Sequence, residues 1–190
     1  MKIKIPANTK KAAINSLKKI ISRAEQLPLK YGHPYNKVMA YTDGYIIWTT
    51  NIDIEIPKAQ QPIDIARIMD SVINTNAKTE INYSELKEHL KKAKLYKSKT
   101  SYGNEVYNYP IKTEKYTVWV DGKKLKLIIE LTENNEIRTI APKQPIYIKP
   151  KDDADENRAL LTPIKLNETA ATELYNRILN YEVNNAFTTE

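Results

Sequence analysis

The residues of this chain that could do chemistry are few, and their spacing assembles no catalytic site. The 190 residues include no cysteine, which excludes disulfides and thiolate metal sites. The two histidines, His33 in a proline-rich loop and His89 in a predicted helix, have no second histidine near them in the sequence. Only four glycines are present, and none forms a loop that would cradle phosphates. We therefore expect a protein that is not an enzyme and that binds no metal or cofactor.

Three other groups of polar side chains have simpler structural explanations. Asp53 and Glu55, followed by Lys58, stand in the order that metal-dependent nucleases use, but an alternating edge strand accounts for both acids. The four acids at 152–156 could bind a hard cation, although a solvated hairpin loop explains them better. Four tyrosines among lysines could stack on single-stranded bases, yet tyrosine is abundant throughout the chain, so packing is the preferred explanation. These tyrosines are Tyr96, Tyr102, Tyr107 and Tyr109.

Charge is spread unevenly along the chain. The formal net charge is +7, and residues 1–30 alone carry eight Lys or Arg against one Glu. Residues 84–103 carry six Lys against two Glu, whereas residues 151–190 carry four cations against eight acids. A basic front half favours a polyanionic partner. No run approaches the roughly 18 apolar residues of a membrane span, and we expect a cytoplasmic protein.

Two basic amphipathic helices are predicted, over residues 10–25 and 84–94. Asn8 or Thr9 can cap the first helix and Ser84 the second, because their side chains can accept from the free N–H groups of a first turn. Apolar residues at three- and four-residue spacing give each helix a side to bury. The outward cations are Lys11, Lys18, Lys19 and Arg23 on the first helix and Lys87, Lys91, Lys92 and Lys94 on the second. Surface helices usually mix both signs of charge, so this pattern favours polyanion contact, with a merely solvated face as the alternative.

Asp-Gly dipeptides at 43–44 and 121–122 predict two tight turns, since glycine accepts the positive φ that such turns require. Strands over 37–41, 45–48 and 52–56 form a predicted meander around the first dipeptide. Strands over 115–120 and 123–131 form a predicted hairpin around the second. The remaining predicted elements are strands at 2–5, 79–83, 137–141, 146–149 and 160–166, a helix at 62–73 and a C-terminal helix from 167 to about 183.

The order of strand, basic helix and meander therefore occurs twice, at about 1–57 and at about 79–166. It predicts an α+β fold with antiparallel sheet and both basic helices on one face. We expect one domain over 1–166, with halves at about 1–60 and 79–166, followed by a helix and tail over 167–190.

Three stretches resemble the bacterial DNA polymerase sliding clamps. Residues 43–56 are similar to their Asp-Gly turn, apolar strand, Thr-Asp-Leu-Glu corner and alternating strand, with Asn51 where those clamps usually have aspartate. Residues 80–93 resemble the strand and helix that open a clamp half-domain. Residues 159–166, Ala-Leu-Leu-Thr-Pro-Ile-Lys-Leu, resemble the closing strand. The resemblance covers about residues 1–166 in the right order.

The resemblance implies a DNA-clamp-like domain of two βαβββ halves whose two helices lie side by side and face duplex DNA. The eight outward cations named above would then contact the phosphate backbone without reading sequence. The resemblance also implies a partner-peptide site that includes Pro163, Ile164 and Leu166.

Two departures keep other interpretations open. Clamp rings contain six such domains, so a chain holding one would encircle DNA only as a homohexamer. This chain also continues for 24 residues beyond Leu166, where bacterial clamps end. We expect a DNA replication or repair accessory of a phage or mobile element that binds duplex DNA, polymerase or clamp-loader proteins. The alternatives are a clamp mimic that binds the clamp loader or clamp partners, and a clamp-fold protein without a replication role.

Overall fold

The computed structural model describes residues 7–24, 26–73, 79–93, 95–99, 105–132, 135–152, 154–166, 169–174 and 176–177. The predicted strand at 2–5, the end of the C-terminal helix, and Lys94, Tyr102 and Asp153 lie outside these residues. The helices are α1 (Ala7–Ser22), a 3-10 helix η1 (Leu27–Lys30), α2 (Ile65–Ile73), α3 (Tyr83–Lys92) and α4 (Gly122–Leu131). The strands are β1 (His33–Tyr35), β2 (Val38–Thr42), β3 (Ile46–Thr50), β4 (Thr79–Ile81), β5 (Tyr96–Lys99), β6 (Glu105–Lys112), β7 (Thr117–Asp121), β8 (Glu136–Thr139), β9 (Ile146–Lys149) and β10 (Ala159–Leu161).

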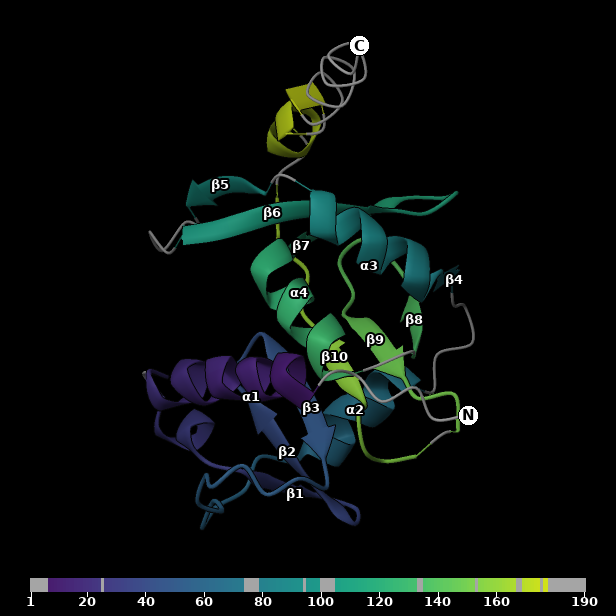
Figure 1. Cartoon of the computed structure of the whole chain (residues 1–190). Helices are drawn as coiled ribbons and strands as arrows, with labels where there is room; N and C mark the ends of the chain where they lie inside the picture. Colours follow the sequence, from purple (N-terminus) through teal and green to yellow (C-terminus); the bar gives the residue numbers. More distant parts are fainter. Residues whose placement is uncertain are drawn as a thin grey trace.

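The strands form two sheets, and every pairing within them is antiparallel. The larger sheet has seven strands in the order β1-β2-β3-β10-β9-β8-β4, and the smaller has the order β5-β6-β7. The smaller sheet lies above α3 and α4, away from β1 and β2 (Figure 1). This arrangement confirms the α+β class predicted from the sequence.

Helices cover both faces of the larger sheet, because its strands bury side chains on both sides. On one face, Tyr41, Ile46 and Trp48 belong to a core that includes residues of α1, α3 and α4 and of the smaller sheet. On the other face, Tyr35, Ala40, Ile47 and Leu160 pack with Ile65, Met69 and Val72 of α2. The large core thus fixes α1, α3 and α4 on the same side of the sheet.

Two predicted strands are wrong. Residues 123–131 form helix α4, because the carboxylate of Asp121 caps the backbone N–H groups of Lys123 and Lys124. Residues 52–56 form no strand, since Glu55 has a φ of 58° and its N–H donates to the Asp53 carboxylate. The sequence predicted the strand there from alternation, yet only Ile54 of its three isoleucines is fully buried.

The sequence analysis did not predict η1, β1, β5 or β6. The remaining described elements agree with the prediction apart from their ends. The first Asp-Gly turn is present, with Gly44 at a φ of 88°. Asn82 caps α3 in place of Ser84, accepting from the N–H groups of Ser84 and Glu85. Residues 169–174 and 176–177 are helical, as predicted for the tail. Among the described residues, no helix is long and apolar enough to span a membrane.

Candidate nucleic-acid interface

Helix α1 has a buried apolar side and an outer side without acids. Ala13, Leu17 and Ile21 are at most 1% exposed, and they follow one another at four-residue spacing. The sixteen residues of α1 include four lysines and no Asp or Glu. Lys11 and Lys19 are exposed, as is Arg23 just beyond the helix. Lys18 is 30% exposed and forms an ion pair with Glu55 at 2.8 Å, which offsets part of its charge.

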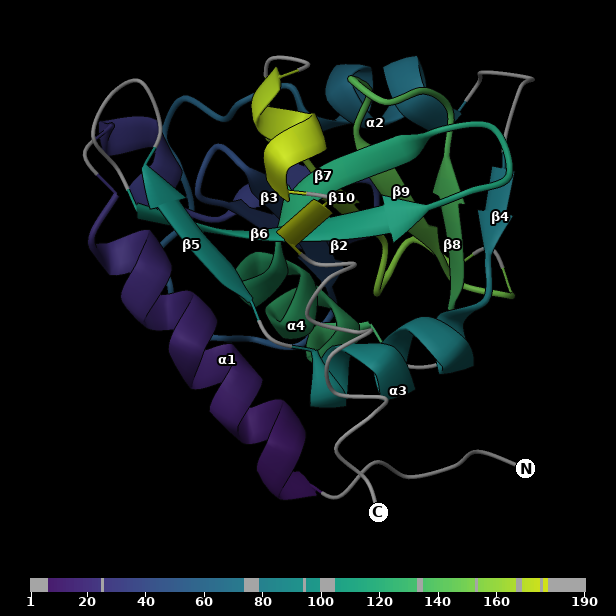
Figure 2. The ribbon, with the colours of Figure 1, turned by 90° about the horizontal axis from the view of Figure 1, so that it is seen from above.

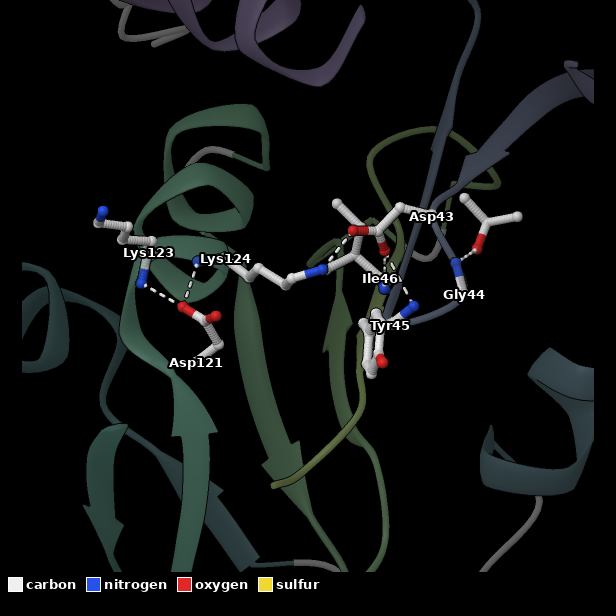
Figure 3. A network of polar contacts seen from close by, with 8 residues as sticks. Asp43, Gly44, Tyr45, Ile46, Asp121, Lys123 and Lys124 are labelled. Atoms are coloured by element: carbon white, nitrogen blue, oxygen red, sulfur yellow. Dashed lines mark hydrogen bonds and ion pairs between the residues drawn. The ribbon is translucent and has the colours of Figure 1, made fainter. Parts of the chain in front are cut away.

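Helix α4 begins at the second Asp-Gly dipeptide. The Asp121 carboxylate accepts from the N–H of Lys123 at 2.9 Å and of Lys124 at 3.3 Å, as Figure 3 shows. Gly122 is buried, and a Cβ there would overlap the Leu95 side chain and lie 3.1 Å from Tyr109 Cβ, so the close packing favours a glycine. The helix then places Lys123, Lys124 and Lys126 near its first turn.

Lys124 joins α4 to the first Asp-Gly turn. Its ammonium forms an ion pair with Asp43 and lies 4.3 Å from the centre of the Tyr45 ring (Figure 3). The Asp43 side chain is only 6% exposed, and its other oxygen accepts from the N–H groups of Tyr45 and Ile46, each at 2.9 Å. Lys124 thus links helix α4 to the β2–β3 turn.

Helix α3 lies on the far side of α4 from α1. The Tyr83 hydroxyl donates to the Ile129 carbonyl of α4 at 2.7 Å, which ties the two helices together. Lys87 is half-buried near the Tyr83 ring, Lys91 pairs with Glu88 at 2.5 Å, and Lys92 is exposed.

The two predicted basic helices are present, but they are not direct neighbours. Helix α1 packs against α4, and α4 packs against α3. Figure 2 shows this order, with α4 in the middle. The prediction that the cations of α1 and α3 lie side by side is therefore wrong in that detail, because α4 separates them.

The lysines of α4 were missed as candidate site residues because residues 123–131 were predicted as a strand. Asp121 was the signal that could have found them, since aspartate is a preferred N-cap residue and Lys123, Lys124 and Leu125 favour a helix.

A groove of about 430 Å³ lies between α1, α4 and β6. Ser16 and Ile20 line it from α1, and Tyr107 and Glu105 from β6. The α4 side contributes the three lysines, Leu127 and Glu130, together with the capping Asp121. The groove therefore combines apolar surface with charges of both signs.

The two histidines have structural roles. His33 is fully buried, with Nε2 3.0 Å from the Pro28 carbonyl and Nδ1 accepting from the Ile63 N–H at 3.1 Å. Burial lowers the pKa of His33 from its ordinary value, and the hydrogen bond to Pro28 opposes this shift. His89 lies 2.6 Å from the Tyr109 hydroxyl. No group of three or more acids, histidines or cysteines that could hold a metal ion occurs in the part of the chain that the structure describes.

Comparisons with solved structures point to one fold. Helicobacter pylori beta clamp in complex with diflunisal superposes with a TM-score of 0.51 at 12% sequence identity, covering 81% of this chain and 63% of that one. The same organism's beta clamp in complex with 3,4-difluorobenzamide gives a TM-score of 0.51 at 11% identity, covering 86% and 66%. The chain has a sliding-clamp-like fold. It spans less than two thirds of the length of either clamp structure. No protein-family model matches the chain, and no curated protein matches it.

The closing segment of the clamp-like fold runs from the larger sheet to the smaller one. The N–H of Thr162 donates to the Tyr45 carbonyl at 2.8 Å, and that of Ile164 donates to the Trp119 carbonyl of β7 at 2.7 Å. Pro163 is buried, while Ile164 and Leu166 are half-buried.

The described part of the tail helix lies beyond the smaller sheet (Figure 1). There the Tyr96 hydroxyl is 3.5 Å from the Arg177 carbonyl. A partner-peptide site at Pro163, Ile164 and Leu166 stays a prediction, as does its coverage by the tail.

Proposed function

We propose that this clamp-like protein is a non-enzymatic accessory that associates with duplex DNA through the outer side of α1 and its neighbour α4. The observation that carries the proposal is the charge of α1, whose sixteen residues hold four lysines and no acid. Such a surface attracts phosphates and releases their counterions, which supplies affinity without sequence specificity. The beta clamps with the same fold support the proposal by analogy only.

The proposed contacts differ in how available their charges are. Lys11, Lys19, Arg23 and Lys92 are exposed. Lys18 and Lys91 are paired with Glu55 and Glu88, so each must exchange its partner for a phosphate. Lys87 and Lys94 complete the set predicted from the sequence, and Lys123 and Lys126 of α4 extend it.

The test is the salt dependence of binding to a blunt duplex, measured by fluorescence anisotropy. The logarithm of affinity should fall with the logarithm of salt concentration by about 0.9 per phosphate contacted. The double variant Lys11→Glu with Lys19→Glu should weaken binding and flatten the slope by about two contacts. The matched control is Arg67→Glu, an exposed cation on α2, which covers the opposite face of the larger sheet.

Equal losses in the α1 variant and the α2 control would overturn the proposed surface. Binding of protein partners without any duplex binding would instead favour the clamp-mimic alternative.

Assembly follows from the same proposal. A single clamp-like domain would surround a duplex only with further copies, and β1 and β4 are the edges of the larger sheet. The mass in solution, with and without DNA, distinguishes a ring from a monomer that binds one side of the helix.

A further inference from the structure

We infer that the groove between α1, α4 and β6 binds an unpaired nucleotide of single-stranded DNA. The inference extends the proposed nucleic-acid role of α1 and α4 to a second ligand. The groove of about 430 Å³ falls in the range of sites that enclose small organic ligands, so it can take one nucleotide but not a duplex.

The groove offers apolar surface of the kind that a base requires. Ile20 of α1 and Tyr107 of β6 are half-buried, and Leu127 of α4 forms part of the same lining. The face of the Tyr107 ring already contacts a charged partner, because the Lys123 ammonium lies 3.4 Å from its centre. Any of the four bases can stack on such a ring, since every base has a π-face.

The charges that remain in the groove favour an anion. Glu105 is paired with Lys97, and the carboxylate of Asp121 caps α4. Lys124 is paired with Asp43. Lys123 and Lys126 are the lysines of the lining that can contact a phosphate. Glu130 is the remaining acid of the lining.

Stacking requires Lys123 to leave the ring. Its four-carbon stem is flexible, so the ammonium can turn to the phosphate of the same nucleotide. The base then replaces a cation on the ring, and the cation keeps an electrostatic partner.

The test measures binding of a short labelled single-stranded oligonucleotide by fluorescence anisotropy, with a blunt duplex measured in parallel. Tyr107→Ala should weaken single-strand binding by roughly five- to a hundredfold, while the matched control Tyr107→Phe keeps the ring and the affinity. Lys126→Gln should weaken binding and Glu130→Gln should strengthen it, each by a fewfold. These two half-exposed positions test the groove even where Tyr107→Ala impairs folding.

The outcomes separate this inference from the proposed duplex contact. Two results would overturn this inference and leave the duplex proposal standing. In the first, the protein binds the duplex but not the single strand. In the second, it binds the duplex, and all groove variants bind the single strand with equal affinity. Single-strand binding that depends on Tyr107 without any duplex binding would support it and overturn the duplex proposal. An acidic peptide that displaces the oligonucleotide and binds more tightly would assign the groove to a protein partner and overturn the inference.

Discussion

The two Asp-Gly dipeptides of this chain begin different structures. At 43–44 the dipeptide lies in the turn that joins β2 to β3, and at 121–122 it lies where β7 ends and α4 begins. Both aspartates use one carboxylate oxygen in the same way, accepting from the N–H groups two and three residues later. The local hydrogen bonds therefore do not decide between turn and helix.

The glycines differ in what their sites demand. Gly44 has a φ of 88° and is exposed, so it is needed for its backbone conformation. Gly122 is buried against Leu95 and Tyr109, so it is needed for its small size. The same dipeptide thus meets one conformational and one steric requirement, and only packing reveals which.

The largest effect should come from Asp43→Ala. The substitution removes the acceptor of two backbone N–H groups and leaves the Lys124 ammonium without its partner, so we expect a loss of about 2–4 kcal/mol in the free energy of unfolding. Asp43→Asn keeps an acceptor for the turn and should cost less. Denaturant melts measure both. Equal losses would show that the turn hydrogen bonds contribute nothing, whereas an unchanged stability of Asp43→Asn would show that the ion pair to α4 contributes nothing.

The next effect compares the two glycines. Gly44→Ala should cost about 1–2 kcal/mol, because an alanine at positive φ is strained whatever the available space. Gly122→Ala should cost about 1–3 kcal/mol by overpacking, partly offset by better helix propensity. A Leu95→Ala background should reduce the cost at Gly122 and leave the cost at Gly44 unchanged. A double-mutant cycle measures this coupling, and rescue at both sites would contradict the distinction.

Asp121→Ala should cost about 1 kcal/mol, the usual loss for an N-cap. Asp121→Ser, which can still cap the helix, should recover most of it. Helical signal in far-ultraviolet circular dichroism and the melting midpoint report the change. A loss as large as that of Asp43→Ala would mean that Asp121 has a partner beyond the helix start.

The smallest effect concerns pH and the region beside the first turn. Burial lowers the pKa of His33 below 6.5, so the folded state prefers the neutral ring and the unfolded chain takes up protons first. Stability is therefore complete above 6.5 and falls as the pH drops through the folded pKa, by less than about 1 kcal/mol between about pH 7 and about pH 6. Hydrogen exchange should increase at β1 and β2, where His33 pairs with Ala40, before it increases in α4. His33→Gln should abolish this difference.

The sequence predicted most elements, and its main failure has a physical cause. Six of the ten residues of α4 are buried, including Leu125, Leu127, Ile129 and Leu131, whose alternation is that of a strand. Lys123, Lys126 and Glu130 keep the three- and four-residue spacing of a helix, but the polar side that they form is narrow. The alternation of the buried residues therefore favoured a strand. Helix α2, with an exposed side, was predicted correctly, and β9 was predicted to the residue.

The sequence predicted only part of the candidate interface, because it predicted a strand at the residues that form α4. The charge of α1 is local and could be found from the sequence, whereas its neighbour could not be identified while α4 was assigned to a sheet. The groove between α1, α4 and β6 depends on contacts between distant segments, which no pattern within the sequence reports.

The position of β10 has a consequence for how the chain is made. This strand lies between β3 and β9 in the larger sheet. The two halves of the sheet can therefore pair only after residue 161 has left the ribosome. Trp48 of β3 pairs with Ala159, which is synthesised 111 residues later. At about 5–20 residues per second, this separation is a delay of roughly 5–20 seconds. During that interval the inner edge of β3 is open to other strands, and the inner edge of β9 is open from residue 149 onward. A chain that stops before Ala159 keeps those edges open permanently, so we expect translation products of that length to be captured by chaperones or to aggregate.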